Sequence, residues 1–123
     1  MGLNVSKIQM ILQELVNGTV DLQGAALVTP DGLPLVTMLP GNMDEERTAA
    51  MSAAMLSLGE RIGGELGRGE LEKVLVEGSQ GYCVLTSCGK DALLLVLANE
   101  AAKQGILLLA IKQAVAELKL VMM

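Results

Sequence analysis

The chain of 123 residues combines a high apolar content with a shortage of reactive side chains. It is 51% hydrophobic, yet it contains no His, Trp or Phe, one Tyr and two Cys. Histidine has the unperturbed pKa nearest neutrality, so its absence removes the commonest general base, nucleophile activator and metal ligand. We therefore expect no enzymatic centre, no cofactor and no metal, and a function carried by a surface.

The length and the net charge of the chain limit its number of domains and its kinds of partner. The length fits one domain over residues 1–123. Nine basic residues against fourteen acidic ones give a net charge of −5, so the chain lacks the positive field that attracts nucleic acid, which we exclude as a partner. The sequence near Lys7 lacks a signal-peptide core, and the apolar runs are too short to span a bilayer. We expect a cytoplasmic protein without a membrane span.

The first third of the chain predicts a helix and a β-hairpin. Asn4 or Ser6 can cap a helix that Gly18 ends, with apolar residues at helical spacing at Ile8, Ile11, Leu12 and Leu15. Two extended runs, 24–29 and 33–39, flank the turn sequence Pro30-Asp31-Gly32. Since Pro34 has no N–H to donate, the second strand is expected at a sheet edge or at a bulge.

A long helix over 44–65 has two unlike faces. One carries Met51, Met55, Leu58 and Ile62, and we expect this face to pack on the sheet. The other carries Ala49, Ser52, Ala53 and Leu56, with Glu60 as its main charge, where a solvated face would carry more Lys and Glu. Small side chains permit close approach of another backbone, which indicates an interface. The alternative is that the chain's own loops cover this face.

The second half predicts three strands and a last helix. Residues 71–77 alternate like a strand, and 82–88 and 92–98 flank the turn Gly89-Lys90-Asp91. A helix follows Asn99. The order α-β-β-α-β-β-β-α predicts an α/β (α+β) fold with five mostly antiparallel strands. The apolar strand 92–98 needs cover on both faces, so we place the long helix on one face and the other two helices on the opposite face.

The two thiols are predicted to stay apart. Cys83 and Cys88 are five residues apart, so in one strand their side chains point to opposite faces of the sheet. No third or fourth soft ligand accompanies them. We expect two reduced cysteines that bind no metal.

Four segments together resemble the Roadblock or dynein-light-chain-type domains, which include bacterial regulators of Ras-like small GTPases. They cover nearly the whole chain and read GAALVTPDGLPL at 24–35, ERTAAMSAAMLSLGERI at 46–62, ELGRGELEKVLVEG at 65–78 and GYCVLTSCGKDALLLVLA at 81–98. The resemblance implies a homodimer whose sheets join through an edge strand and whose central helices lie side by side as a platform for a small GTPase. Nucleotide binding would then belong to the partner.

On this basis the chain is expected to be a homodimeric regulator or scaffold of a Ras-like GTPase. The resemblance also implies that any activation of GTP hydrolysis proceeds without an arginine finger. The alternatives are a passive scaffold and a small-ligand sensor domain. The residues predicted at the dimer or partner interface come from the long helix and the open strand: Ala49, Ser52, Ala53, Leu56, Glu60, Leu71, Lys73 and Leu75.

Overall fold

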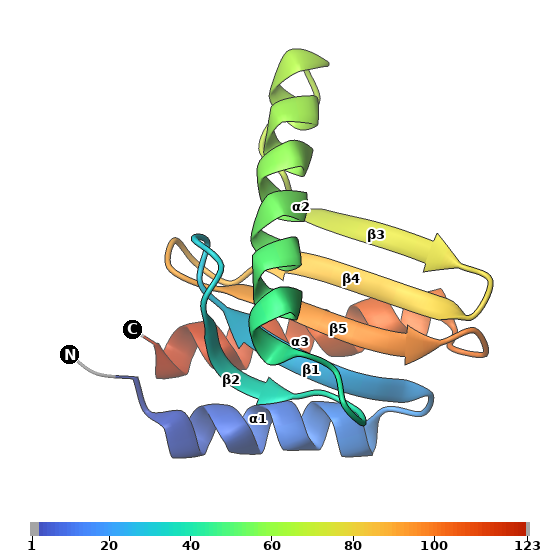
Figure 1. The fold of residues 1–123 in the computed structure, drawn as a ribbon. Coiled ribbons are helices and arrows are strands. Elements are labelled where there is room, and N and C mark those ends of the chain that lie inside the picture. The colour runs from blue at the N-terminus through green and yellow to red at the C-terminus, as the bar shows by residue number, and fades with distance from the viewer. Residues whose placement is uncertain (1–2, 123) are drawn as a thin grey trace.

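The computed structural model describes residues 3–122, which form three helices and five strands in the predicted order (Figure 1). The elements are α1 (Val5–Gly18), β1 (Leu22–Val28), β2 (Pro34–Met38), α2 (Glu45–Glu65), β3 (Lys73–Gly78), β4 (Gly81–Ser87), β5 (Leu93–Asn99) and α3 (Gln104–Val121). Two predicted helix starts are confirmed, because side-chain oxygens of Asn4 and Asp44 accept backbone N–H bonds from Lys7 and Arg47.

The five strands form one sheet in the order β2-β1-β5-β4-β3, with every neighbouring pair antiparallel. β2 lies at one edge, as its proline predicts. Pro34 pairs with Val28, where the register between β1 and β2 shifts, so the strand has both the edge position and the irregularity that proline favours. β3 forms the other edge and contains no proline.

The helices cover the sheet from both sides, which confirms the predicted layers (Figure 1). α1 and α3 pack on one face, where the buried residues include Ile8, Leu12, Leu94, Leu107 and Leu118. α2 packs on the other face over a smaller core that contains Ala49, Leu93 and Leu95. Successive residues of β5 therefore enter the two cores alternately, as expected for a strand covered on both faces.

The cysteines lie on opposite faces of the sheet, as predicted. Cys83 of β4 contacts the core under α2, whereas Cys88 is buried in the core under α1 and α3. Both thiols are free. β4 ends at Ser87, so Cys88 belongs to the loop between β4 and β5 rather than to the strand.

Candidate functional site

The face of α2 that packs on the sheet carries the small side chains. Ala49 is fully buried, Ser52 is 2% exposed, and Gly63, further along the same face, is also buried. The Ser52 hydroxyl donates a hydrogen bond to the carbonyl oxygen of Thr48, so its polarity is satisfied inside the helix. The prediction that the face of Met51, Met55, Leu58 and Ile62 packs on the sheet is confirmed only at Met55, which is half-buried against the core under α2. It was wrong for the other three residues, which are exposed. Ala49 and Ser52, predicted at an interface, face the chain's own sheet and offer a partner no surface.

The turn between β1 and β2 covers a neighbouring part of α2. A methyl group added at Gly32 would lie 3.4 Å from Cα of Ala50 and 3.7 Å from Cβ of Ala53. Gly32 also has a positive φ of 96°, which the turn requires. At Ala53, therefore, a loop of the same chain covers the small-residue face, which was the alternative to an interface. Leu56, half-buried, packs against the core under α2, and Glu60 is exposed.

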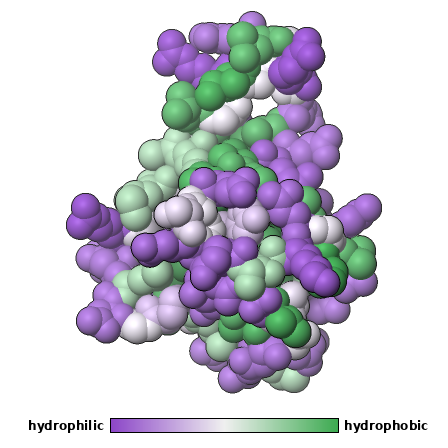
Figure 2. All heavy atoms as spheres, turned by 90° about the vertical axis from the view of Figure 1, so that its right-hand side faces the viewer, coloured by the Kyte–Doolittle hydropathy of each residue, from purple (hydrophilic) through white to green (hydrophobic). Residues whose placement is uncertain are grey.

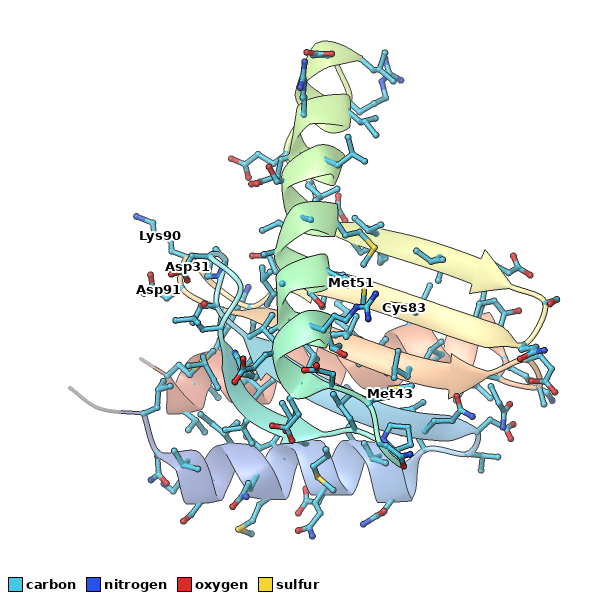
Figure 3. The ribbon with its side chains drawn as sticks, in the orientation of Figure 1. Asp31, Met43, Met51, Cys83, Lys90 and Asp91 are labelled. Carbon is cyan, nitrogen blue, oxygen red and sulfur yellow. The ribbon has the colours of Figure 1, made fainter. Side chains whose placement is uncertain are left out.

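The larger apolar residues of α2 lie on its exposed flank. Met51, Leu58 and Ile62 are 58%, 60% and 47% exposed, and Leu66 at the end of the helix is 65% exposed. Figure 3 shows Met51 projecting to the side of α2 on which β3 and β4 extend. In Figure 2, apolar residues gather near the top of the molecule, where the end of α2 lies. We call Met51, Leu58, Ile62 and Leu66 the exposed stripe.

The second half of α2 extends past the edge strand β3 (Figure 1). Two glycines let the segment before β3 approach this part of the helix closely. A methyl group at Gly59 would lie 2.9 Å from Cδ2 of Leu71, and one at Gly63 would lie 3.0 Å from the carbonyl oxygen of Gly69. The half-buried Leu71 thus fixes the start of β3 beside α2.

β3 leaves an open edge next to the exposed stripe. Lys73 is exposed, and Leu75, 39% exposed, pairs with Val84 of the core under α1 and α3. Val76, 47% exposed, pairs with Cys83 and shares the α2 side of the sheet. The unpaired strand edge, the exposed Val76 and the exposed stripe are together features of the kind that mark protein interfaces.

The three arginines of the chain lie on or just after α2. Arg61 forms an exposed ion pair with Glu65, with 3.2 Å between Nε and Oε1. Nε of Arg68 donates to the carbonyl oxygen of Leu66, and its backbone N–H donates to that of Gly63. Local contacts therefore engage Arg61 and Arg68, and Arg47 lies in the first turn of the helix.

Few side chains within residues 3–122 are suited to metal binding or to catalysis. Within residues 3–122 there is no group of three or more His, Cys, Asp or Glu side chains that could hold a metal ion. Every buried side-chain nitrogen or oxygen in this part of the chain has a hydrogen-bond partner. Burial raises the pKa of the Cys83 thiol, and it raises that of Cys88 to about 11 although Lys119 acts in the opposite direction. Neither thiol is activated as a nucleophile.

None of the three described helices is both long and apolar enough to cross a membrane.

The comparison with known proteins agrees with the fold. The model of the Roadblock/LC7 domain family matches residues 7–98, about three quarters of the chain. An uncharacterized protein of Methanocaldococcus jannaschii is 33% identical over 112 residues, which cover 91% of this chain and 96% of that protein. The structure of Myxococcus xanthus MglB is similar with a TM-score of 0.89 and 21% identity, and 97% of each chain is covered.

A Roadblock/LC7 domain from Streptomyces avermitilis is also similar, with a TM-score of 0.84 and 23% identity, covering 90% of this chain and 93% of that one. The chain thus shares its fold with these two solved structures. The chain belongs to the Roadblock/LC7 domain family.

Proposed function

We propose that the chain is a homodimeric regulator or scaffold that binds a Ras-like small GTPase. The main support for this proposal is the exposed stripe together with the open edge of β3. Four large apolar side chains in a row along a projecting helix are costly to leave in water. The family resemblance supplies the class of partner.

The geometry supports a specific dimer. A two-fold axis normal to the sheet at β3 would pair the two β3 edges antiparallel and give a continuous sheet through both copies. The projecting half of each α2 would then lie over the other copy's sheet. There it would cover Val76 and Cys83, which α2 of the same chain leaves partly exposed. Met51 and Leu58 would meet the second α2.

The interface residues that we propose differ in part from those expected from the sequence. Leu71, Lys73 and Leu75 stay in the proposal because they form or support the β3 edge. On α2, the exposed stripe takes the place of Ala49 and Ser52. Ala53 and Glu60 lie on the opposite flank, beside the turn between β1 and β2.

Two adjacent α2 helices would present their outer faces to the GTPase. In each copy this face carries Arg47, Ala54, Arg61 and Glu65, which are all exposed. The family resemblance implies that any acceleration of GTP hydrolysis proceeds by positioning the partner's own residues rather than by an arginine finger. The local contacts of Arg61 and Arg68 agree with this proposal. A cytoplasmic location belongs to the same proposal.

Single-turnover GTP hydrolysis tests the proposal. A Ras-like GTPase encoded in the same genome is mixed with saturating chain, and binding is measured in parallel. Acceleration that survives Arg47→Ala, Arg61→Ala and Arg68→Ala identifies a regulator without an arginine finger, and binding without acceleration identifies a scaffold. Loss of acceleration with binding retained in Arg68→Ala would show a finger. Absence of binding in both nucleotide states would refute the proposed function.

A further inference from the structure

A groove of about 560 Å³ lies between α3 and the β3–β4 hairpin, on the face of the sheet opposite α2. α3 forms one wall, along which Leu108, Ile111, Lys112, Val115 and Lys119 recur at helical spacing. The other wall runs from Leu71 to Lys73 and includes Val84, Thr86 and Ser87. The groove exists because α1 and α3 cover the other strands and leave this side of β3 uncovered (Figure 1).

The groove has an apolar floor and a basic rim. Val84 and Ile111 are buried at its base, and Leu109 at its side is 57% exposed. Lys73, Lys112 and Lys119 are exposed along it, against one lining carboxylate, Glu72. Three of the six lysines of a chain with a net charge of −5 thus line a single groove. None of these three forms an ion pair within residues 3–122.

The size of the groove limits what can occupy it. From Leu108 to Lys119 the wall spans twelve residues of helix, a rise of about 16 Å at 1.5 Å per residue. This length suits about three turns of a second helix, or about five residues of an extended chain. A bilayer surface is flat and cannot reach the buried floor.

We propose that the groove binds an acidic amphipathic segment of a partner protein. Its apolar side chains would contact Val84, Ile111 and Val115, and its carboxylates would face Lys73, Lys112 and Lys119. This site lies on the face opposite α2 and uses no residue of the exposed stripe, although Leu71 and Lys73 also belong to the proposed β3 edge. It would let the chain hold a second protein while α2 stays free.

Selection from a random 16-residue phage-displayed library on the immobilised chain tests the inference. Recovered peptides are synthesised, and their Kd is measured by fluorescence polarisation against the parent, Lys112→Glu and Lys103→Glu. Lys103 precedes α3 and lies outside the groove, so it is the matched control. We expect peptides rich in Asp, Glu and aliphatic residues. Lys112→Glu should raise their Kd at least tenfold, and Lys103→Glu should change it less than twofold.

The same set of measurements contains the results that would overturn the inference. These are recovered peptides without net negative charge, no recovered peptide, or an equal loss of affinity in both variants. Sedimentation with phosphatidylglycerol vesicles is the membrane control, and binding that Lys112→Glu abolishes would assign the lysines to a lipid surface instead. Leu58→Glu should leave peptide binding intact, and Lys112→Glu should leave GTPase binding intact, so this inference and the proposed function can fail separately.

Discussion

The hydroxyl group of Ser52 donates a hydrogen bond of 2.9 Å to the carbonyl oxygen of Thr48, one turn earlier in α2, while the Ser52 side chain is 2% exposed. A serine that satisfies its own hydroxyl within the helix can pack on an apolar sheet without a further partner. The small size of Ser52, together with that of Ala49, lets α2 approach the sheet closely.

Ser52→Leu should therefore destabilise the fold, because the added methylene groups have no space between α2 and the sheet. We expect the free energy of unfolding to fall by about 1–3 kcal/mol. Ser52→Ala should cost less than about 1 kcal/mol, since donor and acceptor are lost within one turn. Urea unfolding measures both. Ser57→Leu, at an exposed position on the same helix, is the control, and an equal effect there would contradict the account.

Leu58→Glu should abolish the proposed dimer without unfolding the chain. Leu58 is 60% exposed in the single chain, so a carboxylate there stays hydrated, but it would be buried without a counter-charge between two α2 helices. We expect the dimer Kd to rise at least a hundredfold, measured by light scattering over a dilution series. Val20→Glu, at an 81% exposed position after α1, should leave the mass unchanged. A Leu58→Glu protein that stays dimeric would exclude the exposed stripe from the interface.

Gly24→Ala should disrupt the pairing of β1 with β2. A methyl group at Gly24 would lie 2.8 Å from the carbonyl oxygen of Met38 and 2.7 Å from Cδ of Pro40. Because the Met38 oxygen belongs to the backbone of β2, it cannot move away without shifting this edge strand. We expect a loss of about 1–3 kcal/mol.

Gly105→Ala is the opposite case, because nothing lies within 4 Å of the added methyl group in α3. It should stabilise the chain by about 0.5–1 kcal/mol, as expected for Gly to Ala in a helix. Thermal unfolding of the two variants side by side provides the test. If Gly24→Ala melted at or above the parent temperature, that result would contradict the close contact of Gly24 with Met38 and Pro40.

The thiols should react slowly in the folded chain. The pKa of Cys88 is raised to about 11 from 9.0 by burial, so at pH 8 its thiolate fraction is about a hundredfold lower than that of a free thiol. Alkylation by iodoacetamide, followed by mass spectrometry, should be complete only after unfolding. Rapid modification of Cys88 in the native chain would contradict its burial.

The same shift predicts how stability depends on pH. The unfolded thiol loses its proton near pH 9.0, and the folded Cys88 thiol loses it near pH 11. The unfolded state therefore releases a proton first as the pH rises, and the stabilisation present below pH 9 is lost between about pH 9 and 11. Cys88→Ala should remove this part of the pH dependence in urea unfolding between pH 8 and 11.

The order of the elements could be predicted because strong local signals separate them. Pro34 determines an edge position from its own chemistry, and the apolar run of β5 requires cover on both faces wherever the strand lies in the sheet. The contact between Asp21 and Asn99 could not be foreseen. Nδ2 of Asn99 donates to Oδ1 of Asp21, 78 residues away, and Asp21 has a positive φ of 70°.

The orientation of α2 was predicted wrongly for a physical reason. Hydropathy ranks Met51 and Leu58 above Ala49 and Ser52, so periodicity alone directs the larger residues to the sheet. In the structure, side-chain size decides the packing. The small face approaches the sheet closely, and Met51, Leu58 and Ile62 are left exposed. An apolar stripe shows that a helix needs a partner, but it does not show whether that partner is the same chain.

Two copies of the chain are proposed to form one platform for a Ras-like GTPase. Light scattering during size exclusion, with the chain alone and with a GTPase from the same genome loaded with a GTP analogue, tests this proposal. We predict a mass of twice 12.9 kDa for the chain alone, and of two chains plus one GTPase for the mixture. A chain that elutes at 12.9 kDa at micromolar concentration, apart from the GTPase, would contradict the claim.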